Sequence, residues 1–268
     1  PARRDHAGAD PSRGARLPDR IEDIDPPREK VGASAEILST LDKYGLHWDE
    51  EVLYQSQQSA LYNQVLQQLA SEKLSYHCRC TRAQIKAIGG IYQGHCRQLN
   101  LDANQSATRV INAAGIYQYN DLIQGQVTCN KQLAHEDFIV LRKDRLFAYQ
   151  LAVVVDDIYQ GISHVIRGCD LLEPTARQLS FYQILQHQAP NFGHFPLAVT
   201  SAGFKLSKQN NAPSIDKNNP IPSLFAALSF LGQQPPVELQ QASVNELLTW
   251  AISHWSIKHV PKVQEIIL

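Results

Sequence analysis

The sequence predicts an α/β fold with a mainly parallel sheet. Strand patterns and helix patterns alternate through the middle of the chain, an order typical of strands joined by helical crossovers. The chain has 268 residues, of which 43% are hydrophobic. This is enough to bury a substantial core in one large domain or two modest ones.

The N-terminal part of the chain is expected to form one strand and two helices. The segment RIEDID (20–25) sets Ile21 and Ile24 beside three carboxylates and runs into a turn at Pro26 and Pro27, so we expect a strand there. We expect two helices next, because apolar residues recur on one face of each. The face of the first helix consists of Ile37, Leu38, Leu41 and Tyr44, and that of the second of Leu61, Val65, Leu66 and Leu69. Gly45 ends the first helix.

The second half returns to strands and ends in helices. We expect strands at 137–142, 146–157 and 164–168, with a turn at Lys143 and Asp144 between the first two. A helix from Thr175 to about His187 follows. In the tail, Pro222 is expected to begin a helix that ends at Gly232, and Ser243 with Glu246 forms a capping box for another.

Composition excludes several classes of protein. A net charge of -1 excludes a strongly basic surface, so a nucleic acid would have to bind a local patch. No apolar run approaches the ~18 residues that span a bilayer, and no signal peptide opens the chain, so we expect a cytoplasmic protein. Five cysteines, an odd number, favour reduced thiols over a disulfide framework.

Three of those cysteines, Cys78, Cys80 and Cys96, lie within nineteen residues and predict a zinc site. Zinc takes four ligands, and His77, His95 and Tyr92 are the candidates for the fourth. Three protein sulfurs leave little room for a catalytic water, so a structural role is favoured. The alternative is three unpaired structural cysteines.

A second candidate is the segment GFKLSKQN (203–210), in which Lys205 and Lys208 could neutralise a triphosphate while its α-phosphorus is attacked. The alternative is a solvated loop.

A third candidate is a group of polar residues at the ends of expected strands: Glu22, Tyr149, Asp156, Asp157 and Arg167. Open α/β sheets bind ligands beyond the carboxyl ends of their strands. Glu22 could accept a substrate ammonium group, and Arg167 could pair with a carboxylate. In the alternative interpretation, the acidic residues are exposed turn carboxylates and Arg167 is a structural partner of one of them.

Six motifs in order carry a resemblance to a known family: RIEDIDPPRE, YGLHWD, the C-x-C…GGIYQGHC segment, FAYQLAVVVDD, VIRGCDLLEPTARQ and KLSKQN. Together they resemble the glutamyl-Q tRNA(Asp) synthetases, short relatives of the class I glutamyl-tRNA synthetases, over residues 20–268. The resemblance implies a Rossmann-type catalytic core (20–75 and 150–215), an inserted zinc-containing subdomain (76–149) and a helical C-terminal region (216–268). Residues 1–19 are unmatched, and their composition predicts disorder.

The resemblance also implies an activity. Such an enzyme activates L-glutamate with ATP, accompanied by magnesium, and transfers the glutamyl group to queuosine in the anticodon loop of tRNA(Asp). It lacks an anticodon-binding domain, and we expect it to act as a monomer with no membrane partner.

Site residues carry over from the family motifs by position. Glu22, Tyr149 and Arg167 would contact glutamate, while Lys208, with Lys205 beside it, would contact ATP and serve catalysis. The zinc ligands would be Cys78, Cys80, Tyr92 and Cys96, so the resemblance selects the phenol over the histidines. Leu206 stands where the commoner form of the last motif has Met, a swap that conserves volume.

The N-terminal segment departs from the family. Members carry an R-F-A-P-S-P-S-G stretch with a HIGH-like ATP motif before the strand that ends in RIEDID, and nothing in residues 1–19 matches it. The sequence therefore leaves an alternative: a catalytically impaired or non-catalytic, zinc-containing tRNA-binding remnant.

Overall fold

The structure is a computed structural model that describes residues 17–25, 31–201, 203–206 and 215–268. The strands are β1 (Arg20–Ile21), β2 (Leu53–Tyr54), β3 (Ser75–Cys78), β4 (Ala107–Val110), β5 (Gln118–Asp121), β6 (Gly125–Thr128), β7 (Ile139–Leu141), β8 (His164–Gly168), β9 (Asn191–Phe195), β10 (Leu197–Ser201), β11 (Phe204–Lys205) and β12 (Glu265–Ile267). The α-helices are α1 (Ala33–Lys43), α2 (Ser59–Ser71), α3 (Arg82–Ala87), α4 (Lys131–Ala134), α5 (Tyr149–Gln160), α6 (Leu172–Ile184), α7 (Pro220–Phe230) and α8 (Val244–His254).

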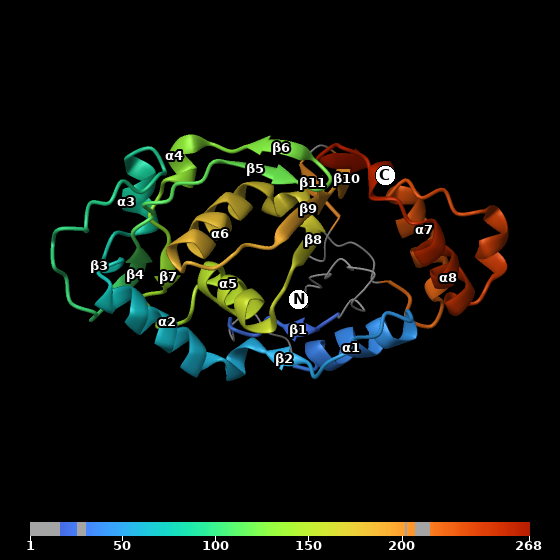
Figure 1. The fold of residues 1–268 in the computed structure, drawn as a ribbon, viewed down its shortest axis with the longest axis horizontal. Helices are drawn as coiled ribbons and strands as arrows, with labels where there is room; N and C mark the ends of the chain where they lie inside the picture. Colours follow the sequence, from blue (N-terminus) through green and yellow to red (C-terminus); the bar gives the residue numbers. More distant parts are fainter. Residues whose placement is uncertain (1–16, 26–30, 202, 207–214) are drawn as a thin grey trace.

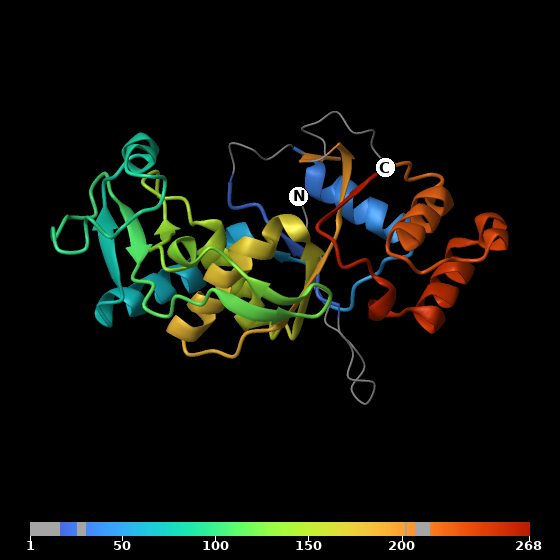
Figure 2. The ribbon, with the colours of Figure 1, turned by 90° about the horizontal axis from the view of Figure 1, so that it is seen from above.

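The molecule is elongated, and its elements fall into three groups along the long axis (Figure 1 and Figure 2). Strands β3, β4 and β7 with helix α3 form one end, and α7 and α8 form the other. Helices α5 and α6 and strands β8 and β9 lie between them, with the β5–β6 hairpin running alongside α6.

The strands form several small sheets where we expected one mainly parallel sheet. Parallel pairing is present in β1–β2, β8–β9 and β10–β12, but these pairs belong to three different sheets. The sheet β3–β4–β7 and the hairpin β5–β6 are antiparallel. Within the described ranges, the expectation of one mainly parallel sheet is therefore wrong, and the fold is mixed α/β.

The expected strand at 146–157 is wrong. Helix α5 occupies most of this segment, and every residue from Leu151 to Asp157 is buried. A helix that is buried all round has no polar face, so its sequence shows no helical period and a valine run resembles a buried strand. The signals for a helix are its twelve-residue length and Gly161, which follows α5 with φ 66°.

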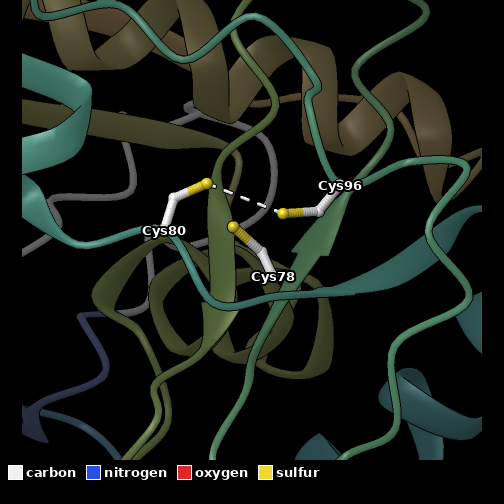
Figure 3. A group of neighbouring side chains, drawn as sticks. All are labelled: Cys78, Cys80 and Cys96. Carbon is white, nitrogen blue, oxygen red and sulfur yellow. Dashed lines mark hydrogen bonds between the residues drawn. The ribbon is translucent and has the colours of Figure 1, made fainter.

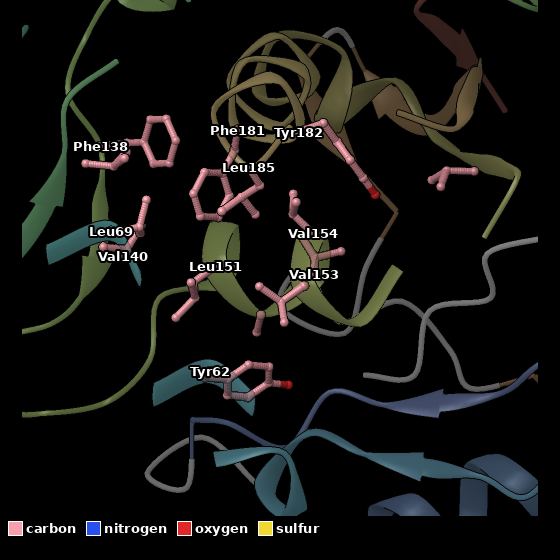
Figure 4. Close-up of a cluster of buried hydrophobic side chains, with 14 of the residues drawn as sticks. Tyr62, Leu69, Phe138, Val140, Leu151, Val153, Val154, Phe181, Tyr182 and Leu185 are labelled. Atoms are coloured by element: carbon pink, nitrogen blue, oxygen red, sulfur yellow. The ribbon is translucent and has the colours of Figure 1, made fainter. Parts of the chain in front are cut away.

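Helix α5 is the centre of the main hydrophobic core. Its buried side chains face α2 on one side and α6 on the other, and β7 closes the end of the cluster (Figure 4). Tyr62 of α2 and Phe181 of α6 are fully buried there. Helices α7 and α8 have a smaller core of their own around Leu228, Leu247 and Ala251.

Most other expected elements are confirmed with shifted ends. Strand β8 and the turn at Lys143 and Asp144 lie where expected, and β7 lies within 137–142. Helix α6 starts three residues earlier than expected, and α7 starts at Pro220, not Pro222. The capping box of Ser243 and Glu246 is confirmed.

Three outcomes concern the ends of the chain. The expected strand at 20–25 is reduced to the two residues of β1. Strand β12, inside the tail expected to be helical, was not predicted; it pairs in parallel with β10. The expectations for residues 1–16 and for Pro26 and Pro27 lie outside the described residues.

Helices of the described ranges include none that is both long enough and apolar enough to cross a membrane.

Candidate functional site

The three predicted cysteines come together (Figure 3), at the end of the molecule that holds β3 and α3 (Figure 1). Cys78 ends strand β3, Cys80 precedes helix α3, and Cys96 lies in the loop beyond that helix. Their sulfur atoms all lie within 4.8 Å of one another, with 3.6 Å between the Sγ atoms of Cys80 and Cys96. All three are free thiols, and Cys78 and Cys96 are buried.

Tyr92 belongs to the same cluster, whereas the two histidines do not. The Tyr92 ring is buried, and its hydroxyl accepts a hydrogen bond of 2.9 Å from the backbone N–H of Cys96. The Arg109 guanidinium lies over the ring, 3.9 Å from its centroid. His95 is exposed, and His77 places its Nδ1 3.5 Å from Thr108; neither joins the cysteine group in the described part of the chain.

The thiols of the cluster differ in acidity. Burial is the largest cause that raises the pKa of Cys80 to about 12, and the hydrogen bonds that its thiol donates to Cys96 and Cys78 add to it. At Cys96 burial also opposes ionisation, but hydrogen bonds from Tyr92 and from the backbone of Arg79 outweigh it and lower the pKa. Cys96 is therefore converted more readily than Cys80 to a thiolate, the form that binds metal.

The donor set fits a soft divalent cation. Tetrahedral zinc with Zn–S bonds of ~2.3 Å requires sulfurs about 3.8 Å apart, close to the 3.6 Å between the sulfurs of Cys80 and Cys96. Thiolates select zinc over the hard cations magnesium and calcium. The described cluster can hold a metal ion, and three sulfurs in a buried setting suit a structural role.

Arg167 lies in a buried polar network at the end of strand β8. Its Nε donates to Nε2 of His194 (3.2 Å), and its Nη2 donates to Thr175 Oγ1 (2.6 Å) and Gln178 Oε1 (2.5 Å). His194 Nδ1 lies 2.6 Å from Oδ2 of Asp121. The alternative in which Arg167 pairs with one of the carboxylates near strand ends is therefore wrong, because its partners are neutral side chains.

Asp156 and Asp157 lie on helix α5, so their expected place at the end of a strand is wrong. Both are buried, not exposed turn residues. Asp156 accepts hydrogen bonds from Gln55 (2.7 Å) and from the Tyr62 hydroxyl (2.9 Å to each oxygen), and Asp157 pairs with Arg20 at 2.8 Å. These contacts make both carboxylates part of the core.

The remaining predicted site residues lie on different elements of the fold. Glu22 follows β1, with its carboxylate 3.9 Å from the Arg20 guanidinium. Tyr149 is the first residue of α5, where we expected a strand, and is half-buried. Lys205 is exposed on β11, and its Nζ pairs with Asp170, just beyond β8, at 2.7 Å. Lys208 lies outside the described residues.

Sequence reasoning missed His194, Asp121, Thr175 and Gln178. The signal in the sequence was a histidine between Phe192 and Phe195 in strand β9. A pocket of about 610 Å³ also opens beside the end of β8. Its lining includes Cys169, Asp170, Glu173 and Cys129, which directly follows β6.

Comparison with known proteins identifies the family. The family model for the catalytic domain of class I tRNA synthetases (E and Q) matches residues 13–241. This chain belongs to the class I tRNA synthetases of the E and Q type. It is accordingly a ligase of the aminoacyl-tRNA synthetase kind.

Relatives at high identity narrow the resemblance. The chain is 61% identical over 252 residues to a protein of Colwellia psychrerythraea named glutamyl-Q tRNA(Asp) synthetase. The alignment covers 92% of this chain and 80% of the relative. A protein of the same name from Photobacterium profundum is 50% identical over 249 residues, covering 93% of this chain and 80% of the relative. The family resemblance drawn from the sequence motifs is thus confirmed.

A solved structure supports the synthetase fold. A glutamate tRNA ligase from Elizabethkingia meningosepticum, in complex with its amino acid, matches with a TM-score of 0.72 at 22% identity. The match covers 91% of this chain, which spans 59% of the length of that ligase. At this identity the likeness shows the class I synthetase fold alone.

Proposed function

We propose that this protein activates L-glutamate with ATP and transfers the glutamyl group to queuosine in the anticodon loop of tRNA(Asp). The observation that carries the proposal is the 61% identity to a relative named for this reaction, over 92% of the chain. Substrates of this kind, tRNA and ATP, place the reaction in the cytoplasm. The similarity does not favour the alternative of a non-catalytic remnant.

The reaction has two steps. In the first, a glutamate carboxylate oxygen attacks the α-phosphorus of ATP, and pyrophosphate leaves with the bonding electrons. In the second, a nucleophile of queuosine attacks the acyl carbon and AMP leaves. The protein contributes mainly by orienting the reactants and by stabilising charge that develops on phosphate oxygens.

The proposed roles follow from side-chain chemistry. Arg167 pairs with a carboxylate of glutamate, since a guanidinium presents several N–H donors in one plane. Glu22 accepts from the substrate ammonium, and Tyr149 contacts the same substrate. Lys205 and Lys208 neutralise the triphosphate, with Lys208 stabilising the charge that moves onto pyrophosphate. The pairing of Lys205 with Asp170 holds this lysine near the carboxyl end of β8, where open α/β sheets bind their ligands.

A zinc ion would be held by Cys78, Cys80, Cys96 and Tyr92, and when bound it would tie the loop after α3 to strand β3. The hydrogen bond of 2.9 Å from the Cys96 backbone N–H holds the Tyr92 hydroxyl beside the cysteines, which supports the phenol as fourth ligand. The placement of β3, α3 and β4 at one end of the molecule supports an inserted subdomain over 76–149 between the two parts of the core, 20–75 and 150–215. Magnesium would accompany ATP, and a monomer suffices for the reaction.

Two assays on the purified full-length protein test the proposal. We expect ATP–pyrophosphate exchange that depends on L-glutamate, and transfer of labelled glutamate to tRNA(Asp) that contains queuosine but not to tRNA(Asp) that lacks it. Arg167→Ala should raise the KM for glutamate, while Arg142→Ala, which removes an exposed guanidinium paired with Asp144, should not. Exchange without a requirement for glutamate, or equal labelling of the two tRNAs, would contradict the proposal.

A further inference from the structure

Arg167 is held by side chains from three different elements. Thr175 and Gln178 come from α6, and His194 comes from β9, the strand that pairs in parallel with β8. His194 is held in turn by Asp121, the last residue of β5. All of these side chains are buried, so the network is shielded from water and its hydrogen bonds have few alternatives.

The protonation of His194 follows from its three neighbours: Arg167 and the Thr175 hydroxyl, whose Oγ1 lies 3.0 Å from Nε2, on one side of the ring, and Asp121 on the other. A guanidinium offers only donors, so Nε2 of His194, which faces the Nε–H of Arg167, must present a lone pair. The imidazole proton therefore lies on Nδ1, which donates to the Asp121 carboxylate over 2.6 Å. Burial, the largest cause, lowers the pKa of His194, in agreement with a neutral ring.

The Asp121 carboxylate is strongly anchored. Its Oδ1 accepts from the backbone N–H groups of Ile123 (2.9 Å), Gln124 (2.8 Å) and His194 (3.1 Å). Together with the imidazole N–H, these donors keep the carboxylate ionised in spite of its burial, and the pKa of Asp121 is lowered. An anchored carboxylate holds the imidazole in a single tautomer.

The network uses only part of the Arg167 guanidinium. Nε and Nη2 have partners, while Nη1 makes no hydrogen bond within the described part of the chain. The guanidinium carbon also lies 5.0 Å from the centroid of the Phe192 ring, which restrains its plane. One edge of the group is thus held by the protein, and Nη1 keeps two N–H donors for a ligand.

We propose that Asp121 and His194 are positioning residues for Arg167: Asp121 selects the Nδ1-protonated tautomer of His194, and that tautomer orients the guanidinium toward the carboxylate of the amino-acid substrate. This inference rests on the proposed function. It adds two residues, from β5 and β9, that do not touch the substrate but determine how well it binds.

The decisive variant is Asp121→Asn, which keeps the size of the side chain. The amide must still satisfy the backbone donors with its oxygen, so its NH₂ group faces His194 Nδ1. The ring proton then moves to Nε2, where it opposes the Nε–H of Arg167. Because two donors cannot share one hydrogen bond, the guanidinium is displaced.

The expected result is a selective loss of glutamate binding. In glutamate-dependent ATP–pyrophosphate exchange, we expect Asp121→Asn to raise the KM for glutamate about tenfold or more while the KM for ATP changes less than about twofold. His194→Gln, whose amide has both a donor and an acceptor, should retain more of the glutamate affinity than His194→Leu. Nitrogen-15 NMR of the imidazole should show the Nδ1–H tautomer in the wild type and the Nε2–H tautomer in Asp121→Asn.

A matched control separates positioning from general destabilisation. Asp137→Asn alters another buried carboxylate, whose partners are Arg97, Tyr76 and Asn112, and it should lower stability without a selective rise in the KM for glutamate. If the wild type is active and Asp121→Asn has an unchanged KM for glutamate, or the tautomer is the same in both, the inference is wrong and the proposed function stands. If the wild type shows no glutamate-dependent exchange, the proposed function itself is wrong.

Discussion

The Arg177 guanidinium, on helix α6, donates a hydrogen bond to Oε2 of Glu136, which lies just beyond the short helix α4. The other oxygen of Glu136 accepts from the backbone N–H of Tyr92 at 2.9 Å. One carboxylate therefore joins the loop of the cysteine cluster to the helix that also carries Thr175 and Gln178, two partners of Arg167. Both side chains of the ion pair are largely shielded from solvent.

Breaking this link should weaken the fold. Glu136→Gln sets an amide NH₂ against the Arg177 guanidinium while leaving an acceptor for the Tyr92 N–H. We expect the free energy of unfolding, measured in urea, to fall by about 1.5–3 kcal/mol, the range for hydrogen bonds to charged groups. Glu238→Gln, at an exposed position, is the control and should stay within about 0.5 kcal/mol of the wild type. Equal stability of the two variants would show that the link contributes nothing.

Metal content should depend on the cysteine cluster. Cys80→Ser replaces a sulfur that lies 3.6 Å from that of Cys96, whereas Cys129→Ser changes a buried thiol outside the cluster. Elemental analysis after dialysis should find about one zinc per chain in the wild type and in Cys129→Ser, and much less in Cys80→Ser. Full zinc content in Cys80→Ser would rule out the cluster as the metal site.

The fourth ligand can be tested separately. Tyr92→Phe keeps the buried ring under Arg109 but removes the hydroxyl. If the phenol binds the metal, competition with a chelator should show weaker zinc binding by tenfold or more, roughly the effect of disturbing a metal site. His95→Ala should leave the affinity unchanged, since His95 is exposed and outside the group. The reverse result would restore a histidine as the ligand.

The folded protein should become less stable as the pH falls below about 6.5, because of His194. Burial is the largest cause of its lowered pKa; the charge of Arg167 adds to it and the hydrogen bond to Asp121 opposes it. Below the ordinary value of 6.5 the unfolded chain takes up a proton at this histidine that the folded protein resists, so acid favours unfolding by up to about 1.4 kcal/mol per pH unit. His194→Gln has no imidazole to take up this proton, so the variant lacks this loss of stability in acid. Urea titrations at pH 7.5, 6 and 5 should therefore show that the difference in the free energy of unfolding between wild type and variant becomes smaller as the pH falls. A constant difference would mean that His194 titrates normally.

Two glycines of like conformation should respond differently to alanine. Gly161 (φ 66°) and Gly232 (φ 74°) end helices α5 and α7 in the left-handed region. A Cβ at Gly161 meets nothing within 4 Å, whereas one at Gly232 would lie 2.3 Å from the carbonyl oxygen of His259. We expect Gly161→Ala to lose about 1 kcal/mol and Gly232→Ala roughly 2–5 kcal/mol, because backbone clash is added to the strain. Calorimetry of both variants measures the difference, and similar melting temperatures would contradict it.

Local features of this protein could be predicted because their atoms are close in sequence. The capping box of Ser243 and Glu246 joins residues three apart, and its side-chain bonds form as soon as the helix does. The cysteine cluster was visible from its spacing for a similar reason, since a strand end and one short helix suffice to bring the thiols together. The motifs also identified the family, which the comparisons confirm.

Helix α5 shows where local information ends. The same valine run suits a strand or a helix, and burial on all sides removes the polar face that would distinguish them. Only packing between α2 and α6 selects the helix, and with it the positions of Tyr149, Asp156 and Asp157.

The sequence by itself determined the family, the caps of several helices and the thiols that can hold a metal. Tertiary structure decided how Arg167 is held, because its partner His194 is 27 residues away and Asp121 is 73 residues from that histidine. A hydrogen bond between distant residues leaves no periodic trace in the chain. It exists only where strands β5, β8 and β9 and helix α6 exclude water together, so that each buried donor must find its acceptor within the protein.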